Sequence, residues 1–512
     1  MTPPVAEPPG ARAARRRYVT LSALLWLPPG LGMATMVLLF GERGMSLAAI
    51  AGLFAAHSLT VALLELPTGG LSDVLGRRPV LAVAGALGGV AFALIGLGTS
   101  GWLLTAGTVL MGVARALASG TAEAWYVDTV QGCAGPDADL RTGLARGGSA
   151  TSVALAAGIL LGGALPWLLG RGPGLGARLS EATSGAVLPL SVPLLLGAAL
   201  RIVFVVYVMA ALREPPRPPA TLRSVLSGVP VTVLDGLRLG ARDALVRRIL
   251  LASAAAGSAL AAVELLVPSR TAATTGTTGS GAMVYAALAC AGFVCSGVGS
   301  HLAPLTARVA GSGERAVPAA LAAGAGGLLL LGVTTPSVRP AATILAVVGF
   351  GLVYLALGVA GPNENDLLHR RVTGAGRATA LSVQSLAQQL TGALIGLVIG
   401  GLPPGPLPWL FPGAVLLSAA LLWLRRVDGR VINDRRGDGR WVKGRRINGC
   451  RSKPAGSKTA GARTAGSQTA GSETAGADEG THDRQGSDAG THDHRSNAPG
   501  VDDGRSANAG SA

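Results

Sequence analysis

The distribution of apolar residues along the chain predicts twelve membrane-spanning helices. Long apolar stretches with few charges follow one another from residue 18 to residue 424. A helix rises about 1.5 Å per residue, so about 20 apolar residues cross the roughly 30 Å hydrocarbon core of a bilayer. A β-barrel would instead show alternation in segments of about ten residues. The spans are expected near residues 18–40, 47–66, 79–99, 102–127, 147–169, 186–211, 247–268, 281–299, 316–333, 341–361, 378–401 and 407–424.

The longest connection between spans divides this all-α polytopic protein into six spans plus six. It covers residues 212–246 and opens with the proline-rich stretch REPPRPP at residues 213–219, which cannot continue a helix. The fifth and eleventh spans share the spacing GxxxGG, at 158–163 and 396–401. This echo indicates two six-helix pseudo-repeats, although chance recurrence in a glycine-rich chain explains it equally well. The two expected bundles cover residues 18–211 and 247–424.

The positive charges predict which way the bundle is oriented. Lys and Arg accumulate in cytoplasmic loops, whereas Asp and Glu contribute little to orientation. With the N-terminus inside, the inner segments before the tail hold about twenty arginines against five in the outer loops. We therefore expect a multi-pass protein of the plasma (inner) membrane with both termini, including the basic segment 1–17, in the cytoplasm. The five outer arginines are Arg43, Arg171, Arg178, Arg270 and Arg339.

The composition changes abruptly after Leu424. Residues 425–453 hold eleven Lys or Arg against three Asp, which is typical of a juxtamembrane segment that contacts anionic lipid headgroups. Residues 454–512 are rich in Ala, Gly, Ser and Thr and repeat the triplet TAG. Such a segment has too little apolar surface to offset the entropy of ordering, so we expect a disordered low-complexity tail.

Composition excludes an ordinary soluble enzyme. The chain is 49% hydrophobic and 14% charged, whereas a soluble domain carries about 25% charged residues. The chain contains no GxxxxGK[ST] phosphate loop, and its four cysteines match no metal-binding spacing. The net charge of +16 follows from the inner loops and the basic tail and does not indicate nucleic acid. We expect no enzyme activity, no metal and no cofactor.

The connection between the second and third spans carries the most specific motif. It reads ELPTGGLSDVLGRRPVL at residues 65–81 and resembles the first signature loop of the major facilitator superfamily, G-x-L-x-D-R-x-G-R-R, with Val74 in place of the first arginine. The resemblance implies the major facilitator fold and secondary transport. It also implies a charge relay with Asp128 that latches the outward-facing state; a solvated helix end is an equally good explanation of Asp128. The latch residues on this resemblance are Gly69, Asp73, Gly76, Arg77, Arg78 and Asp128.

A second resemblance to the same family lies in the fourth span, in the stretch RALASGTAEAWYVDTV at residues 115–130. Family members carry a mid-span arginine that is associated with proton coupling, followed by a glycine; here Arg115 precedes Gly120 by five positions rather than four. Glu123 lies two turns further on, on roughly the same helical face. The expected proton-coupling residues are therefore Arg115 and Glu123, and a purely structural buried pair is the alternative.

Other polar residues within the spans are candidates because charges are costly in hydrocarbon. Glu264 in the seventh span could take up a proton or a cationic substrate, unless it is an interfacial carboxylate in water. Five residues are expected to line a substrate cavity: His57, Arg201, Ser385, Gln388 and Gln389. Interhelical hydrogen bonds explain the last three equally well, and His57 is more often a packed polar residue.

The resemblance is to the drug:proton-antiporter type of multidrug efflux protein, although the antiporter signature G-P-x-x-G-G of the fifth span stands here as GILLGG, without its proline. The resulting hypothesis is proton-coupled efflux of small amphiphilic compounds by alternating access, with the substrate, protons and the lipid bilayer as partners and a monomer as the functional unit. Two alternatives remain open: a facilitator or symporter that imports a metabolite, and a non-transporting membrane receptor or scaffold.

Overall fold

The computed structural model describes residues 9–135, 138–171, 174–214, 238, 243–337, 339–372 and 376–424. All regular elements in these ranges are helices, and no strand occurs among them. Twelve helical segments of this described part are long and apolar enough to cross a membrane. The prediction of an all-α protein with twelve membrane-spanning helices is thereby confirmed.

The first six spans contain two interrupted helices. The first span is divided between α1 and α2, and the fourth between α5 and α6, while a short helix, α8, lies between the fifth and sixth spans. The elements of this half are α1 (Pro9–Met33), α2 (Met36–Glu42), α3 (Leu47–Leu75), α4 (Arg77–Leu97), α5 (Gly101–Ala118), α6 (Thr121–Ala134), α7 (Arg141–Arg171), α8 (Leu175–Ala182), the 3-10 helix η1 (Pro189–Ser191) and α9 (Val192–Ala211).

The last six spans are single helices, several of them longer than the hydropathy pattern predicts. Helix α14 continues ten residues beyond the predicted end of its span at residue 361, because polar residues extend a helix after its apolar stretch has ended. The elements are α11 (Ala244–Thr275), α12 (Thr278–Val309), α13 (Gly313–Val333), α14 (Pro340–Arg371), α15 (Gly376–Gly401) and α16 (Leu407–Leu424).

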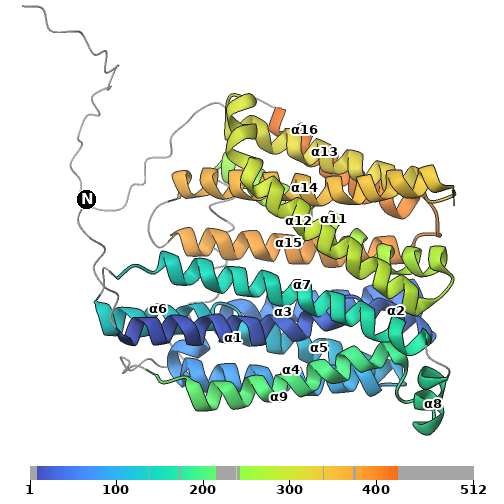
Figure 1. Cartoon of the computed structure of the whole chain (residues 1–512). Helices are drawn as coiled ribbons and strands as arrows, with labels where there is room; N and C mark the ends of the chain where they lie inside the picture. The colour runs from blue at the N-terminus through green and yellow to red at the C-terminus, as the bar shows by residue number, and fades with distance from the viewer. Residues whose placement is uncertain are drawn as a thin grey trace, which may run out of the picture. The chain divides into compact units, whose positions relative to one another are not determined.

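Successive spans run in opposite directions (Figure 1). We call the end of the bundle at which α1 begins the proximal end, and the opposite end, which carries α2 and α8, the distal end. The α3–α4 connection at Gly76 lies at the proximal end, as do the first residues of α7, α11 and α15. The α1–α3, α7–α9 and α11–α12 connections lie at the distal end.

Helix packing follows the two six-helix pseudo-repeats. Within the first half α1 packs on α7, and α4 packs on both α5 and α9; the equivalent pairs of the second half are α11 with α15 and α13 with α14 and α16. Between the halves, α3 packs on α15 and α7 on α12. These two contacts are equivalent, because each joins the second helix of one half to the fifth helix of the other. The GxxxGG echo thus belongs to a real repeat.

Two glycines of that echo bring the halves together in the distal part of the bundle. A Cβ atom added to Gly163 of α7 would lie 2.6 Å from the Cβ atom of Ala286 in α12. A Cβ atom on Gly400 of α15 would lie 2.6 Å from the Cβ atom of Ala51 in α3. Small residues allow this close approach of helix backbones, which drives helix association in lipid.

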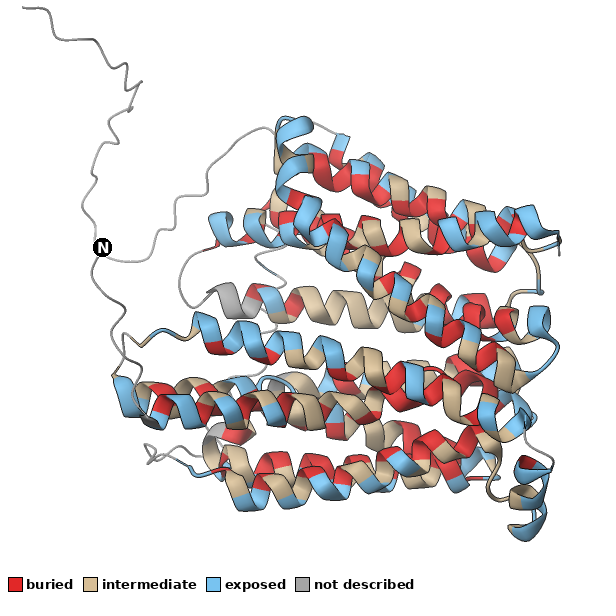
Figure 2. Cartoon of the chain, viewed as in Figure 1, coloured by how far each residue is buried: buried red, intermediate tan, exposed pale blue. Residues whose placement is uncertain are grey.

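Large apolar side chains cover the outward faces of the helices, where Figure 2 shows exposed positions along both halves. Val309 is 82% exposed, Trp102 70% and Leu63 65%. Exposed apolar patches of this extent are rare on soluble monomers. The outer surface is therefore suited to contact with lipid.

We expect Gly400→Leu to separate the halves at the distal end. The added side chain has no space beside Ala51, and overpacking of this kind costs about 1–3 kcal/mol, which shifts a two-state equilibrium about 5- to 150-fold. Spin labels at Trp102, in the first turn of α5, and at Pro404, between α15 and α16, should report longer distances in this variant. Gly401→Leu is the matched control, because nothing lies within 4 Å of a Cβ atom on Gly401; equal distances in both variants would contradict the expectation.

Candidate functional site

Two adjacent cavities lie in the middle of the bundle. The first, which we call the N-half cavity, has a volume of about 490 Å³ and is lined only by residues of the first six spans. The second, the interface cavity, has a volume of about 370 Å³ and is lined by residues of both halves. His57, Met111 and Arg115 belong to the walls of both cavities. Small-molecule sites have volumes of about 300–1,000 Å³, so each cavity is large enough for a ligand.

The interface cavity brings together six of the residues that the sequence singles out. Helices α3 and α5 contribute one wall, and α11 and α15 contribute the other. Gln388 and Gln389 belong to its wall at a place where α11 and α15 pack closely: a Cβ atom on Gly257 would collide with the carbonyl oxygen of Gln388. The predicted residues in its wall are His57, Arg115, Glu264, Ser385, Gln388 and Gln389.

The ionisable groups of the interface cavity come from opposite halves. Arg115 reaches it from α5 and Glu264 from α11, and both side chains are exposed to the cavity rather than packed in the core. His57 is less accessible, and its Nδ1 atom lies 3.4 Å from the carbonyl oxygen of Thr108. This contact between α3 and α5 agrees with a packed polar residue, although His57 also borders the cavity.

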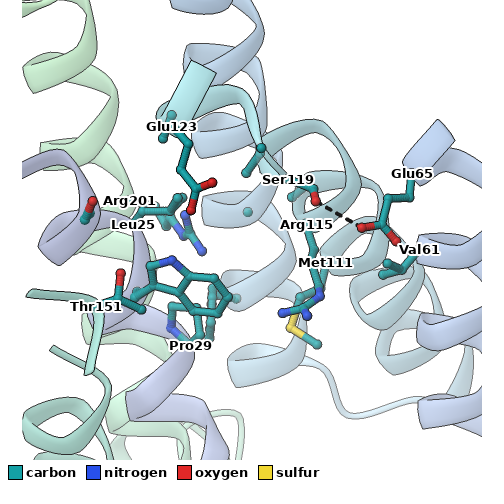
Figure 3. A pocket seen from close by; sticks show the side chains of 18 of the residues that line it. Leu25, Pro29, Val61, Glu65, Met111, Arg115, Ser119, Glu123, Thr151 and Arg201 are labelled. Carbon is teal, nitrogen blue, oxygen red and sulfur yellow. Dashed lines mark hydrogen bonds between the residues drawn. The ribbon is translucent and has the colours of Figure 1, made fainter. Parts of the chain in front are cut away.

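The N-half cavity holds the remaining predicted ionisable residues of the first half, Glu123 and Arg201, together with Arg115 (Figure 3). The guanidinium of Arg115 lies 5.6 Å from the ring centroid of Trp26, within cation–π range. On the other side of Arg115, the hydroxyl of Ser119 donates a 3.1 Å hydrogen bond to the carboxylate of Glu65.

The fourth span is not the continuous helix that the sequence analysis assumes. Helix α5 ends at Ala118 and α6 begins at Thr121, and between them Gly120 adopts a left-handed conformation with φ of +67°. The expectation that Arg115 and Glu123 share one face of one helix is therefore wrong. Glycine tolerates this conformation and so permits the break. Both residues still line the N-half cavity, but among the described side chains they form no salt bridge.

Two of the residues assigned to the predicted latch are in contact at the proximal end. Arg77, in the first turn of α4, forms a 2.8 Å salt bridge with Asp128 of α6, so Asp128 is not simply a solvated helix end. Gly76, between α3 and α4, has φ of +109°, a conformation that residues with a Cβ atom rarely adopt. Gly69 and Asp73 lie in the last turns of α3. The structure does not describe their surroundings.

Glu214, which no motif in the sequence indicates, completes this loop. Glu214, three residues beyond the end of α9, accepts a 2.5 Å hydrogen bond from the backbone N–H of Arg78. A carboxylate is favourable there because the first N–H groups of a helix are unsatisfied and carry positive partial charge. The guanidinium of Arg78 donates to the carbonyl oxygen of Met209, and the indole of Trp125 donates a 2.9 Å hydrogen bond to the carbonyl oxygen of Arg213. The segment after α9 thus fastens the α3–α4 loop to α6.

A second missed residue is Glu364, which is 3% exposed in α14. Its carboxylate accepts a 2.8 Å hydrogen bond from the hydroxyl of Ser253 in α11 and a 3.4 Å one from the amide of Gln384 in α15. Gln384 lies one helical turn before Gln388, so this cluster is adjacent to the interface cavity on its proximal side. The sequence pattern predicts that the tenth span ends at residue 361, so Glu364 is expected outside it. The polar pair Asn363 and Glu364 directly after an apolar helix is the signal that could have identified this residue.

The second half has an ion pair of its own at the proximal end. Asp243 caps α11 by accepting hydrogen bonds from the N–H groups of Leu245 and Val246, at 2.8 and 3.2 Å. The same carboxylate lies 2.5 Å from the Nε atom of Arg371 at the end of α14. Each half therefore has a proximal salt bridge that ties its fourth helix to a neighbour.

Two charged loop residues stabilise connections outside the spans. Arg43, at the distal end, donates 2.6 Å hydrogen bonds to the carbonyl oxygens of Gly185 and Ala186, and its partial burial lowers the pKa of its guanidinium. The hydroxyl of Thr142 donates to Asp139 ahead of α7 and lowers the pKa of that carboxyl.

In the described part of the chain, no group of three or more His, Cys, Asp or Glu side chains could hold a metal ion.

Comparison with known proteins agrees with this architecture. Residues 20–397 match the Major Facilitator Superfamily. Among solved structures, the chain is similar to the nucleoside transporter NupG, with 14% sequence identity and a TM-score of 0.62 over 80% of this chain and 98% of that one. It is similar to a D-xylose-proton symporter with 16% identity and a TM-score of 0.62, over 83% of this chain and 100% of that one.

A third similar structure is a bacterial homolog of the human lysosomal transporter Spinster, in an inward-facing and occupied conformation. Its identity is 14% and its TM-score 0.62, over 82% of this chain and 97% of that one. At these identities the likeness concerns the fold. No curated protein matches the chain in sequence.

We expect Gly76→Ala to destabilise the first half by about 1–3 kcal/mol, because an alanine is strained at this φ and its Cβ atom would lie 2.8 Å from the Glu214 carboxylate. Unfolding by sodium dodecyl sulfate in mixed micelles measures the change. Gly132→Ala, in the last turn of α6 with open space around it, is the control and should not destabilise the protein, because an added methyl group meets no neighbour there. The same change in both variants would argue against a strained turn at Gly76.

Proposed function

The chain belongs to the Major Facilitator Superfamily, and from this premise we propose that it exports small amphiphilic compounds from the cell in exchange for protons. The observation that carries the proposal is the interface cavity. It lies between the two halves, and its wall combines Arg115 and Glu264 with the amides of Gln388 and Gln389. Apolar surface with a few converging polar groups suits an amphiphilic ligand.

Alternating access requires that the halves separate at one end while they close at the other. The distal contacts of Gly163 and Gly400 are glycine contacts between helix backbones and leave no bulky side chain to disengage. At the proximal end, the Arg77–Asp128 pair and Glu214 hold the first half together as a unit. In the proposal, this latch keeps the first half rigid while rocking of the two halves exposes the cavities to each side in turn.

Proton coupling is assigned to Arg115, Glu123 and Glu264. All three side chains border the cavities and are accessible from them. Protonation of either carboxylate removes a negative charge near Arg115 and so changes which partner or substrate the guanidinium attracts. One charge that crosses a 100 mV potential is worth about 2.3 kcal/mol, which is enough to bias export about fiftyfold.

The orientation in this proposal follows from the arginines. The proximal end carries the inner segments that hold about twenty of them, so it faces the cytoplasm by the positive-inside rule. The protein then lies in the plasma membrane with both termini inside, and one chain supplies both halves of the cavity, as a monomer requires. Of the central linker 212–246, the structure describes Leu212–Glu214, Arg238 and residues 243–246. The tail 425–512 lies outside the described residues.

We expect Arg115→Ala and Glu264→Gln to abolish efflux that depends on the proton gradient. The first removes the charge shared by both cavities, and the second removes a carboxylate that can exchange a proton. Loss of fluorescent cationic, neutral and anionic dyes from energised cells, with and without an uncoupler, measures the flux, and Asp73→Asn tests the latch. Arg171→Ala, a change at a residue whose guanidinium stacks on Trp167 away from the cavities, is the control.

Uncoupler-sensitive efflux of any dye that is lost in the first two variants and kept in the control would support an exporter. If no dye leaves the cells in a gradient-dependent way, and uptake into loaded vesicles does depend on the gradient, the protein is an importer or symporter.

Deletion of residues 425–512 separates transport from a scaffold role. A transporter needs only the helical bundle, so the truncated chain should retain at least about half of the flux of the full chain; lost contacts of the basic segment with anionic lipid are expected to affect insertion more than turnover. Flux per molecule, normalised to protein in the membrane, is the measurement. A membrane receptor that acts through its basic tail would show no flux in either form and would lose its phenotype on truncation.

A further inference from the structure

Arg201 stands out among the charged residues of the N-half cavity because its charge has no counterpart. The side chain is 8% exposed in α9, and its Nε atom is buried without a hydrogen-bond partner. It forms no salt bridge with any described residue. Its guanidinium lies 6.0 Å from the ring centroid of Phe92 and 5.8 Å from that of Phe204.

A buried cation of this kind is costly to keep. Removing an ion from water is unfavourable unless a partner of opposite charge compensates. Cation–π contacts with phenylalanine offset only part of that cost. An intramembrane arginine that borders a cavity is therefore expected to meet an anion there.

The neighbouring carboxylates do not compensate Arg201 in this structure. Glu65 borders the same cavity but accepts the hydroxyl of Ser119. Glu123 points into the cavity, as Figure 3 shows, but lies beyond salt-bridge distance from Arg201. Arg115 adds a second guanidinium to this cavity, and it too forms no salt bridge among the described side chains. Two arginines thus line one cavity, and neither forms a salt bridge with a described carboxylate.

The cavity around the two arginines also provides an apolar surface. Trp26, Leu25, Pro29 and Phe92 line it. Space for the guanidinium of Arg201 is created by Gly88 of α4, where an added Cβ atom would lie 3.2 Å from the Nε atom. A ligand with one anionic group and an aromatic or aliphatic body would match both parts of this wall.

We propose that the N-half cavity is a binding subsite for amphiphilic anions, in which Arg115 and Arg201 hold a carboxylate, sulfonate or phosphate group. The apolar body of the ligand packs against Trp26 and Phe92. This inference rests on the proposed function, since it assigns a charge class to the exported amphiphile. Glu123 is the internal competitor for the same two cations.

Isothermal titration calorimetry on the purified full chain tests the subsite with two matched ligands. 1-Naphthaleneacetate and 1-naphthaleneethanol share the ring and differ in carboxylate against hydroxyl. The wild type should bind the carboxylate about tenfold to hundredfold more tightly than the alcohol, because a charge pair forms in a poorly solvated site. Arg201→Gln should abolish this preference, while affinity for the alcohol stays within about twofold, since no charge pair with the alcohol is lost.

Two further variants keep the test decisive if Arg201→Gln fails to fold. Arg201→Lys retains the charge without the planar fork and should keep part of the preference. Glu123→Gln removes the competing carboxylate and should increase the affinity for 1-naphthaleneacetate severalfold. A residue that served only to hold helices together would change stability in these variants and leave the preference for the carboxylate unchanged. Arg171→Gln, on the distal surface, is the control for loss of any arginine.

Equal binding of the two ligands by the wild type, or a carboxylate preference that survives Arg201→Gln, would overturn the subsite. The outcome is distinguishable from failure of the proposed function. Gradient-dependent efflux of cationic dyes together with no carboxylate preference leaves the exporter intact and removes the anion subsite. A clear carboxylate preference without any efflux keeps the subsite and removes the exporter.

Discussion

Close packing of helix backbones is the constraint on which the rest of this structure depends. In lipid every backbone polar group must be satisfied within the protein, so the chain crosses the bilayer as helices. Lipid is as apolar as leucine, and helices therefore associate through close contact at small residues. Gly158 against Gly30, Gly163 against Ala286 and Gly400 against Ala51 are contacts of this kind. Glycine is needed at these three positions because a larger side chain would separate the helices.

The same packing determines where polar residues can lie. The second helix of each half packs on the fifth helix of the other, so the halves meet along two equivalent seams. Between these seams lies the interface cavity, the place where side chains of α5, α11 and α15 can be charged or polar without facing lipid. Arg115 from the first half and Glu264 from the second half therefore line the same cavity, and neither forms a salt bridge within its own helix.

The sequence predicts the helices and much of the cavity wall, because both depend on local patterns. Apolar length identifies the spans, and the cost of charge in hydrocarbon identifies Arg115, Glu264 and Arg201 as residues that need an interior environment. Features that depend on backbone geometry cannot be predicted from these local patterns. The break at Gly120 moves Glu123 to a separate helix, and Glu364 lies in a helical extension that hydropathy does not register. Glu214 reaches Arg78 only because α9 ends beside α4, which no local pattern indicates.

The distribution of charge between the halves is asymmetric although the fold is not. The fourth helix of the first half carries Arg115 into both cavities, whereas α14, the fourth helix of the second half, carries the buried Glu364 hydrogen-bonded to Ser253 and Gln384. The packing of the helices is equivalent in the two halves and does not explain why the fourth helix carries Arg115 in one half and Glu364 in the other. This difference in charge lies in the polar side chains in and beside the cavities. In the interface cavity, Arg115 comes from the first half and Glu264 from the second, so groups of opposite charge line the two walls. In the proposed function, Glu264 gives a proton a site outside the apolar wall near Trp26, whereas Glu123 lies in the same cavity as that wall and the two arginines.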